Sequence, residues 1–191
     1  TSDAEGQFSY VKQAADRGYD VLILEGPLAS HWIQKLEQGN EKVRFSRVDS
    51  DSLDKLIDKG EEIPSKLSAA EEEKLKPLFE GAVNKEKFTV QLESMPEQDA
   101  PILITQPEFI RRMMEQQRMG GGGFYGAFPE MYQLVVNGNH PVMSKVLKMK
   151  SARQQETVKQ LVDLAMLSQG LLKGEALTEF IQRSVSGMVE S

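Results

Sequence analysis

Three closely spaced aspartates come nearer to a metal-ligand motif than any other residues of this chain. Asp49, Asp51 and Asp54 could supply carboxylate oxygens, which are the ligands that Ca²⁺ prefers in a calcium-binding loop. Such a loop also needs glycine at its sixth position and glutamate at its twelfth, where this chain has Asp54 and Gly60. The calcium interpretation therefore fails, and the aspartates are better explained as residues that cap the start of a helix.

Other combinations of reactive side chains give no more support for a catalytic, cofactor or metal site. The chain has no cysteine, and its two histidines, His31 and His140, are far apart, so a zinc site would also need carboxylates. The glycines at 120–123 lack the lysine and hydroxyl residue of a phosphate-binding loop, and we interpret them as a hinge. No nucleophile, base and orienting acid stand out as a set. The sequence therefore predicts no catalytic residue, no metal and no bound cofactor.

The composition is that of an ordinary globular protein, with 39% apolar and 27% charged residues among 191. The net charge of −6 argues against a nucleic-acid partner, because phosphate binding needs clustered lysine and arginine. The local basic cluster of Arg111, Arg112 and Arg118 is expected to be a solvated helix face. The longest clean apolar run, Val21–Leu24, is too short to cross a membrane. Because the absence of cysteine suits a reducing compartment, we expect a cytoplasmic protein without a membrane partner.

The first part of the chain has the pattern of a small α/β unit. Helices are expected at 8–17 and 28–38, and they alternate with strands at 20–25 and 43–48. The first of these strands contains the apolar run Val21–Leu24, which is typical of a strand that is buried on both faces.

A charged stretch after the α/β unit marks the expected domain boundary. Leu53, Leu56 and Ile57 at helical spacing predict a short helix, and Pro64 indicates a linker after it. The first domain is expected to span residues 1–62 and the second residues 63–191. The second domain is expected to be α+β, with a helix that starts at a Ser68–Glu71 capping box and breaks at Pro77, strands at 87–93, 102–105 and 131–136, and helices at 106–118, 151–169 and 174–188.

The last two helices carry the clearest periodicity in the chain, with apolar residues recurring three, four and seven positions apart. Further apolar residues, including Leu164 and Leu167, widen the first stripe beyond what one partner face needs. The surplus favours a self-associating helical hairpin that forms a four-helix bundle with a second copy. The alternative is that both stripes pack within their own domain. The candidate dimer-interface residues are Val158, Leu161, Val162, Ala165, Leu177, Phe180, Ile181, Val185 and Met188.

The segment 109–119 mixes methionines with bulky apolar and charged residues. Methionine surfaces adapt to varied partners because the side chain is unbranched and polarizable. This segment could therefore be a binding helix, or Met113 and Met114 could be core residues. Trp32, the one tryptophan, leaves the same two possibilities open, since an exposed tryptophan anchors partners but a buried one is commoner.

Seven short segments follow one another in an order that is known from one protein family. They are Gly18–Glu25, Trp32, Val48–Asp49 with Leu53–Leu56, Leu75–Leu78, Pro101–Thr105, Asn137–Val142 and Leu164–Gly170. Together they resemble the heat-shock protein 90 chaperone family in its bacterial form, over nearly the whole chain. The first three resemble the end of the middle domain and the last four the C-terminal dimerization domain. The resemblance implies a C-terminal fragment, with a small α/β/α middle-domain remnant before an α+β dimerization domain that ends in a helical hairpin.

The resemblance also implies a homodimer that binds unfolded or partly folded client proteins. Carried over by position, the client-binding residues are Trp32, Phe109, Ile110, Met113, Met114 and Met119. Gln117 and Arg118 stand where relatives often have apolar residues, so the patch is expected to be smaller or shifted toward Met119. Gly138 replaces a proline that is usual after the matching asparagine, which concerns only the turn before His140.

The chain is thus expected to serve an ATP-dependent chaperone of the stress response, without a catalytic site of its own. The resemblance places ATP and Mg²⁺ in the N-terminal domain of the parent protein, outside this chain, and co-chaperones stay unspecified. An alternative from another class is a small α/β enzyme with a site near Glu25 and Gly26, at the carboxyl end of the strand at 20–25. No convergent acid and base support that alternative.

Overall fold

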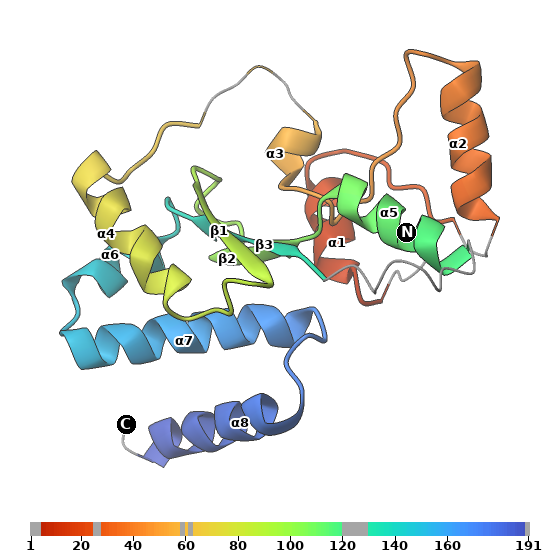
Figure 1. The fold of residues 1–191 in the computed structure, drawn as a ribbon. Helices are drawn as coiled ribbons and strands as arrows, with labels where there is room; N and C mark the ends of the chain where they lie inside the picture. The colour runs from red at the N-terminus through yellow and green to blue at the C-terminus, as the bar shows by residue number, and fades with distance from the viewer. Residues whose placement is uncertain (1–4, 25–27, 58–59, 61–62, 120–129, 190–191) are drawn as a thin grey trace. The chain divides into compact units, whose positions relative to one another are not determined.

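The computed structural model describes residues 5–24, 28–57, 60, 63–119 and 130–189 (Figure 1). The elements in chain order are α1 (Phe8–Asp16), α2 (Ala29–Gly39), α3 (Leu53–Leu56), α4 (Ala69–Glu80), β1 (Phe88–Glu93), β2 (Ile102–Thr105), α5 (Glu108–Met119), β3 (Tyr132–Asn137), α6 (Pro141–Lys148), α7 (Ser151–Ser168) and α8 (Gly174–Val189). This mixture of helices with a small sheet confirms the expected α+β class.

The backbone forms two compact units. Unit 1 comprises Thr1–Lys59 and Gln106–Tyr125, and unit 2 comprises Gly60–Thr105 and Gly126–Ser191. Unit 1 thus takes in α5, which the sequence assigned to the second domain. The division of the protein into domains at residue 62 stays a prediction.

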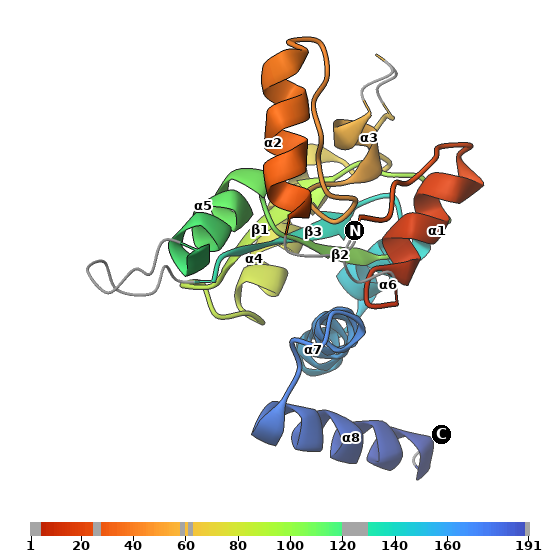
Figure 2. The ribbon, with the colours of Figure 1, turned by 90° about the vertical axis from the view of Figure 1, so that its right-hand side faces the viewer.

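A three-stranded sheet in the order β1-β3-β2 is the centre of unit 2. Strand β3 pairs in parallel with β1, where Phe88 lies opposite Tyr132 with stacked rings 5.5 Å apart, and antiparallel with β2, where Ile102 lies opposite Val136. Leu134 and Val136 of the central strand are fully buried. Helix α4 packs against β1 and α7 packs against β2, so the sheet shares one apolar core with these helices. Helix α8 lies on the side of α7 that is remote from the sheet, as both views show (Figures 1 and 2).

Helix α4 begins where the sequence predicts, but it does not break at Pro77. A capping box joins Ser68 and Glu71, and the Ser68 N–H donates to the Glu71 carboxylate at 2.9 Å. Pro77 lies inside the helix, which continues to Glu80, so the expected break is wrong. Leu75 and Phe79, on either side of the proline, are fully buried, while Pro77 itself is exposed. Their burial therefore holds the helix together across the one backbone hydrogen bond that proline cannot make.

Helix α6 is an element that the sequence reading missed. Its signals are Pro141 at the first helical position and lysines in the last turn, both of which favour a helix. The ring nitrogen Nδ1 of His140 accepts a hydrogen bond from the Val142 N–H at 3.2 Å and so caps the helix. Met143 and Val146 of α6 are fully buried in the core.

Unit 1 lacks both strands that the sequence predicts, within its described residues. Residues 20–24 and 43–48 are outside any regular sheet, and the side chains of Leu22 and Ile23 are 63% and 53% exposed. The expectation of a strand buried on both faces is therefore wrong for the described chain. A strand needs a neighbouring strand to accept its backbone hydrogen bonds. At Phe45 those bonds go to side chains instead: its N–H donates to Glu37 at 2.8 Å and its carbonyl accepts from Arg112 at 2.9 Å.

Polar pairs take the place of a large core in unit 1. Asp49 binds Gln7 and accepts two hydrogen bonds of 2.8 Å from Arg47, and its backbone carbonyl accepts from the Gln106 N–H at 3.2 Å. Asp54 pairs with Arg17 at 2.6 Å. Two of the aspartates that resembled calcium ligands therefore bind cationic side chains.

Candidate functional site

Helix α2 presents an apolar stripe to solvent. Leu28, directly before the helix, and Trp32 and Leu36 are 72%, 58% and 38% exposed. They stand four residues apart, so they share one side of the helix. The tryptophan is therefore an exposed residue rather than a core residue. Leu28 and Leu36 were not predicted to be part of this stripe, although their four-residue spacing from Trp32 indicates it.

Helix α5 supplies a second set of apolar side chains to unit 1. Phe109 is 70% exposed, and Ile110, Met113 and Met114 are partly exposed. The sulfur of Met114 lies 3.7 Å from the side-chain nitrogen of Gln106. Met113 and Met114 are therefore not fully buried core residues, which was the alternative to a binding helix. The side chain of Met119 lies outside the described residues, as do the glycines expected to form a hinge.

Arg112 joins α5 to α2 within unit 1. Its Nη1 and Nη2 donate to the two carboxylate oxygens of Glu37 at 2.9 and 3.1 Å, and Nη2 also donates to the Phe45 carbonyl at 2.9 Å. Its Nε donates to Glu108 at 2.7 Å. The Glu37 side chain is only 11% exposed. The hydrogen bonds from Arg112, together with the one from the Phe45 N–H, lower the pKa of Glu37 from 4.5 to about 2.

Glu108 is the second carboxylate of this network, at the first turn of α5. It binds Arg111 at Nε (3.1 Å) and Nη2 (2.5 Å), in addition to Arg112. Burial raises the pKa of Glu108, but the hydrogen bonds from the two arginines outweigh it, so the net shift is downward. Arg111, Arg112 and Arg118 were expected to form a solvated face, yet the Arg111 side chain is 17% exposed and Arg111 and Arg112 are both bound to carboxylates. A glutamate three and four residues before them was the signal that could have predicted this. The Arg118 side chain lies outside the described residues.

The hairpin of α7 and α8 presents the second large apolar surface, in unit 2. Ile181, Val185 and Met188 on α8 are 52%, 56% and 77% exposed, and Leu164 and Leu167 on α7 are exposed as well. The other candidate interface residues lie differently: Val158, Val162 and Phe180 are buried within the chain, and Leu161, Ala165 and Leu177 are half-buried. The stripes that the sequence showed therefore divide into a part that packs internally and a part that faces solvent.

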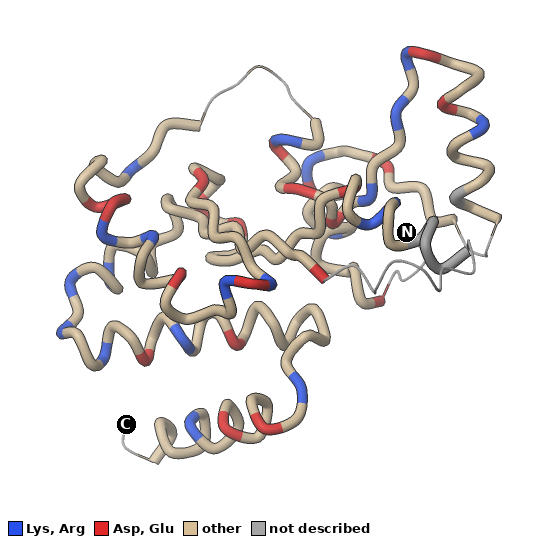
Figure 3. Tube along the Cα trace, in the orientation of Figure 1, with Lys and Arg blue, Asp and Glu red and all other residues tan. Residues whose placement is uncertain are grey.

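Polar contacts fix α8 on α7. Arg183 of α8 binds Asp163 of α7, whose side chain is 6% exposed, and Lys159 approaches the same carboxylate at 3.5 Å. The side chains of Gln160 and Ser184 are hydrogen-bonded at 3.1 Å. Positive and negative residues alternate along α7, whereas on α8 two acidic residues precede the basic Arg183 (Figure 3).

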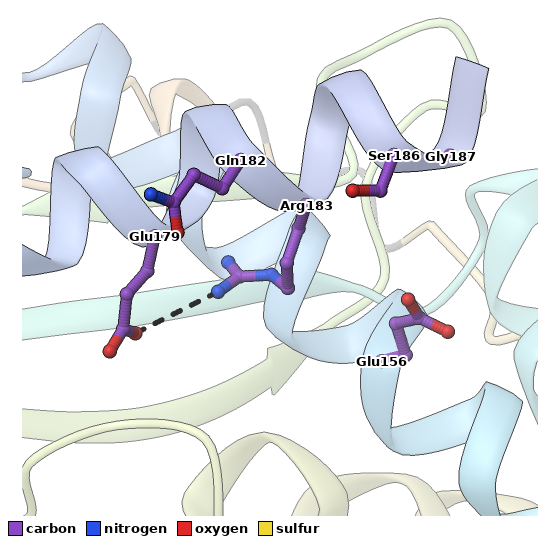
Figure 4. Close-up of a pocket in the computed structure, with 6 residues that line it drawn as sticks. All are labelled: Glu156, Glu179, Gln182, Arg183, Ser186 and Gly187. Atoms are coloured by element: carbon purple, nitrogen blue, oxygen red, sulfur yellow. Dashed lines mark ion pairs between the residues drawn. The ribbon is translucent and has the colours of Figure 1, made fainter. Parts of the chain in front are cut away.

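A shallow pocket lies beside these contacts, between α7 and α8. It is lined by Glu156, Glu179, Gln182, Arg183, Ser186 and Gly187, and the Arg183 guanidinium lies 3.9 Å from Glu179 (Figure 4). Arg183 is already engaged by Asp163, so the pocket does not present a free cation to a ligand. We assign no chemistry to it.

In the described part of the chain, no group of three or more histidine, aspartate or glutamate side chains could hold a metal ion. No helix there is long and apolar enough to cross a membrane. Glu25 and Gly26, where the alternative enzyme site was expected, lie outside the described residues.

Comparison with known proteins gives clear relatives. No profile of a known protein family matches the chain. A chaperone protein HtpG of Porphyromonas gingivalis is 35% identical over 252 residues, which cover 96% of this chain and 37% of that protein. HtpG proteins of Bacteroides fragilis and Bacteroides thetaiotaomicron are 30% and 29% identical over 253 residues, with the same coverage.

The relatives differ from this chain in length. The chain spans about 37% of the length of the curated relatives that it matches. The matched stretch is 252 residues long while this chain has 191, so the relatives carry additional residues within it. The likeness nevertheless extends over 96% of this chain, and it confirms the resemblance that seven colinear segments predicted. The chain is thus similar over nearly its whole length to about 37% of the length of the HtpG chaperones, which are its homologues.

Proposed function

We propose that this chain is the C-terminal, dimer-forming and client-binding part of a molecular chaperone. The observation that carries the proposal is the exposure of Trp32 and Phe109, two large aromatic side chains at positions to which the family resemblance assigns client binding. Large exposed aromatic residues are typical anchors of protein interfaces, because they bury much apolar area at a low cost in side-chain entropy. Unfolded proteins offer the apolar segments that such anchors bind.

The second part of the proposal is a homodimer formed by α7 and α8. Ile181, Val185 and Met188 form a solvent-facing stripe on α8, and Leu164 and Leu167 extend it onto α7. A second copy can cover the same stripe by twofold symmetry, which makes a four-helix bundle. Val158 and Val162 support this interface from inside the protomer, because they fix α7 on the core, and Phe180 of α8 is buried as well.

In this proposal the chain acts by binding and assembly and not by catalysis. ATP and Mg²⁺ belong to an N-terminal domain of the parent protein. Dimerization through α7 and α8 raises the effective concentration of the two N-terminal domains for each other. Client binding then couples the nucleotide cycle to protein folding in the cytoplasm.

Substitution of the two aromatic residues tests the client-binding part. In the double variant Trp32→Ala with Phe109→Ala, we expect the affinity for a permanently unfolded client protein to fall about tenfold or more, since two anchor residues are removed. Fluorescence anisotropy of the labelled client measures the affinity. Gln34→Ala, an exposed polar residue on the same helix α2, is the matched control and should bind as the unaltered chain does. Unchanged affinity in the double variant would overturn the client-binding assignment.

A further inference from the structure

One side chain connects three segments of unit 1. Arg112 on α5 binds the Glu37 carboxylate on α2 through two hydrogen bonds and the Phe45 carbonyl on the extended segment through a third. Two parallel N–H···O bonds to one carboxylate fix the direction of approach as well as the distance. The contact therefore sets how α5 lies against α2.

The backbone of Phe45 makes this contact a closed network. Its N–H donates to Glu37 at 2.8 Å while its carbonyl accepts from Arg112 at 2.9 Å. The two charged side chains therefore make the backbone hydrogen bonds that a neighbouring strand would otherwise make with Phe45. Loss of either charged side chain removes the ion pair between α5 and α2, and it leaves one backbone group of Phe45 without its partner. Unpaired polar groups in a partly buried site are costly, so the network should open as a whole.

The two helices that Arg112 joins carry the proposed client-binding residues. Trp32 lies on α2, five residues before Glu37, and Phe109 lies on α5, three residues before Arg112. We propose that Arg112 is a positioning residue, which holds α2 with its Trp32 stripe and α5 with Phe109 in one fixed relative orientation for client binding. This inference rests on the proposed function for its client-binding part, but the attachment of α5 to α2 can be measured without any client.

Rigid attachment matters for clients that are long enough to touch both helices. When one part of a client is bound to α2, the next part of the same client meets a fixed α5 at a high effective concentration. If α5 moves freely, this effective concentration falls. In Arg112→Gln we therefore expect the affinity for a long unfolded client to fall about tenfold. A short apolar peptide that covers only one helix should bind with unchanged affinity.

The first measurement needs no client and uses the full chain. Because the chain has no cysteine, spin labels can be placed on Lys35→Cys and Phe109→Cys, at two exposed positions of α2 and α5. We expect a narrow distribution of label distances in this chain and a broad one after Arg112→Gln or Glu37→Gln. Combining both substitutions should add no further broadening, since each one opens the same network. Arg112→Lys should restore the narrow distribution only in part, because lysine cannot donate the paired hydrogen bonds.

Arg111→Gln is the matched control for the charge change, since Arg111 stands on the same helix and pairs with Glu108 of α5. It should leave the label distances narrow and the affinity for the long client unchanged. A narrow distribution of label distances in both Arg112→Gln and Glu37→Gln would overturn the claim that Arg112 attaches α5 to α2, whatever the measured client affinities. A broad distribution with an unchanged affinity for the long client would overturn the positioning role. If the Trp32 and Phe109 double variant bound clients normally, the proposed function would fail instead.

Discussion

Different interactions hold the two units of this chain together. Unit 2 buries a sheet between helices around side chains such as Leu134, Phe79 and Met143, all of which are fully buried. In the described part of unit 1 the buried apolar residues are Tyr10, Ala14 and Leu53, and ion pairs join its segments. Apolar burial contributes to stability in proportion to area, whereas partly exposed ion pairs contribute little but fix geometry. By this comparison unit 2 supplies most of the stability, and unit 1 carries the proposed binding surface, whose geometry the ion pairs fix.

The largest expected effect contrasts one core residue with one surface residue. Phe79→Ala should lower the free energy of unfolding by about 3–5 kcal/mol, because it removes a fully buried aromatic side chain from the core of unit 2. Trp32→Ala in unit 1 removes a larger side chain that is 58% exposed, and it should change stability by less than about 0.5 kcal/mol. Urea unfolding followed by circular dichroism measures both values. Equal losses in the two variants would contradict the division of roles.

The next effect concerns self-association through α8. Ile181→Glu with Val185→Glu places two charges on each copy of the proposed interface, where twofold symmetry brings like charges together. The side chains are exposed, so folding should persist while the dimer dissociation constant rises about a hundredfold or more, which corresponds to about 2.7 kcal/mol. Light scattering over a concentration series measures the mass.

Gln182→Glu is the control for the dimer prediction, because it introduces the same charge at an exposed polar position of α8. Its mass should equal that of the unaltered chain at every concentration. These substitutions test the interface more specifically than truncation of the chain after Lys150 would. The truncation would also remove the buried Val158 and Val162 from the core. If the unaltered chain were monomeric at every concentration, the dimer proposal would be wrong.

The same contrast explains what could be predicted from the sequence. The strands at β1, β2 and β3 and the helices α4, α7 and α8 were predicted within a few residues, because apolar periodicity records burial in unit 2. The periodicity could not separate residues that face the core, such as Val162, from residues that face solvent, such as Val185. Both kinds recur at helical spacing, and they are told apart only by how α7 packs on the sheet and α8 packs on α7.

In unit 1 the sequence predicted the helices α1, α2 and α5 within two residues. It did not predict how the segments between them are held, since long-range polar contacts decide the structure there. Val21–Leu24 has the composition of a buried strand, but composition does not state whether a neighbouring strand is present to pair with it. Arg112 and Glu37 are 75 residues apart in the sequence, and no local pattern links two residues at that separation. The exposed Trp32 was likewise left open, because exposure is set by what the rest of the fold covers.

The smallest expected effect is a pH dependence that belongs to unit 1. The hydrogen bonds from Arg112 lower the pKa of Glu37 from 4.5 to about 2, so the carboxylate is charged in the folded state well below its usual range. A depressed pKa contributes stability that is fully present above the unfolded value and is lost as the pH falls toward the folded value. The attachment of α5 should therefore hold from pH 7 to about pH 4 and weaken between about pH 4 and pH 2. Because Arg112 is 38% exposed, solvent screens the pair and its contribution should be about 1 kcal/mol.

The spin-label distances between α2 and α5 measure this transition directly. They should stay narrow down to about pH 4 and broaden below it, whereas Glu37→Gln should be broad throughout and show no transition of its own. The apolar core of unit 2, where the rings of Phe88 and Tyr132 stack, has no reason to follow the same curve. Broadening near pH 6 would mean that a group other than Glu37 controls the attachment, and the contrast between the two units would then need a different physical basis.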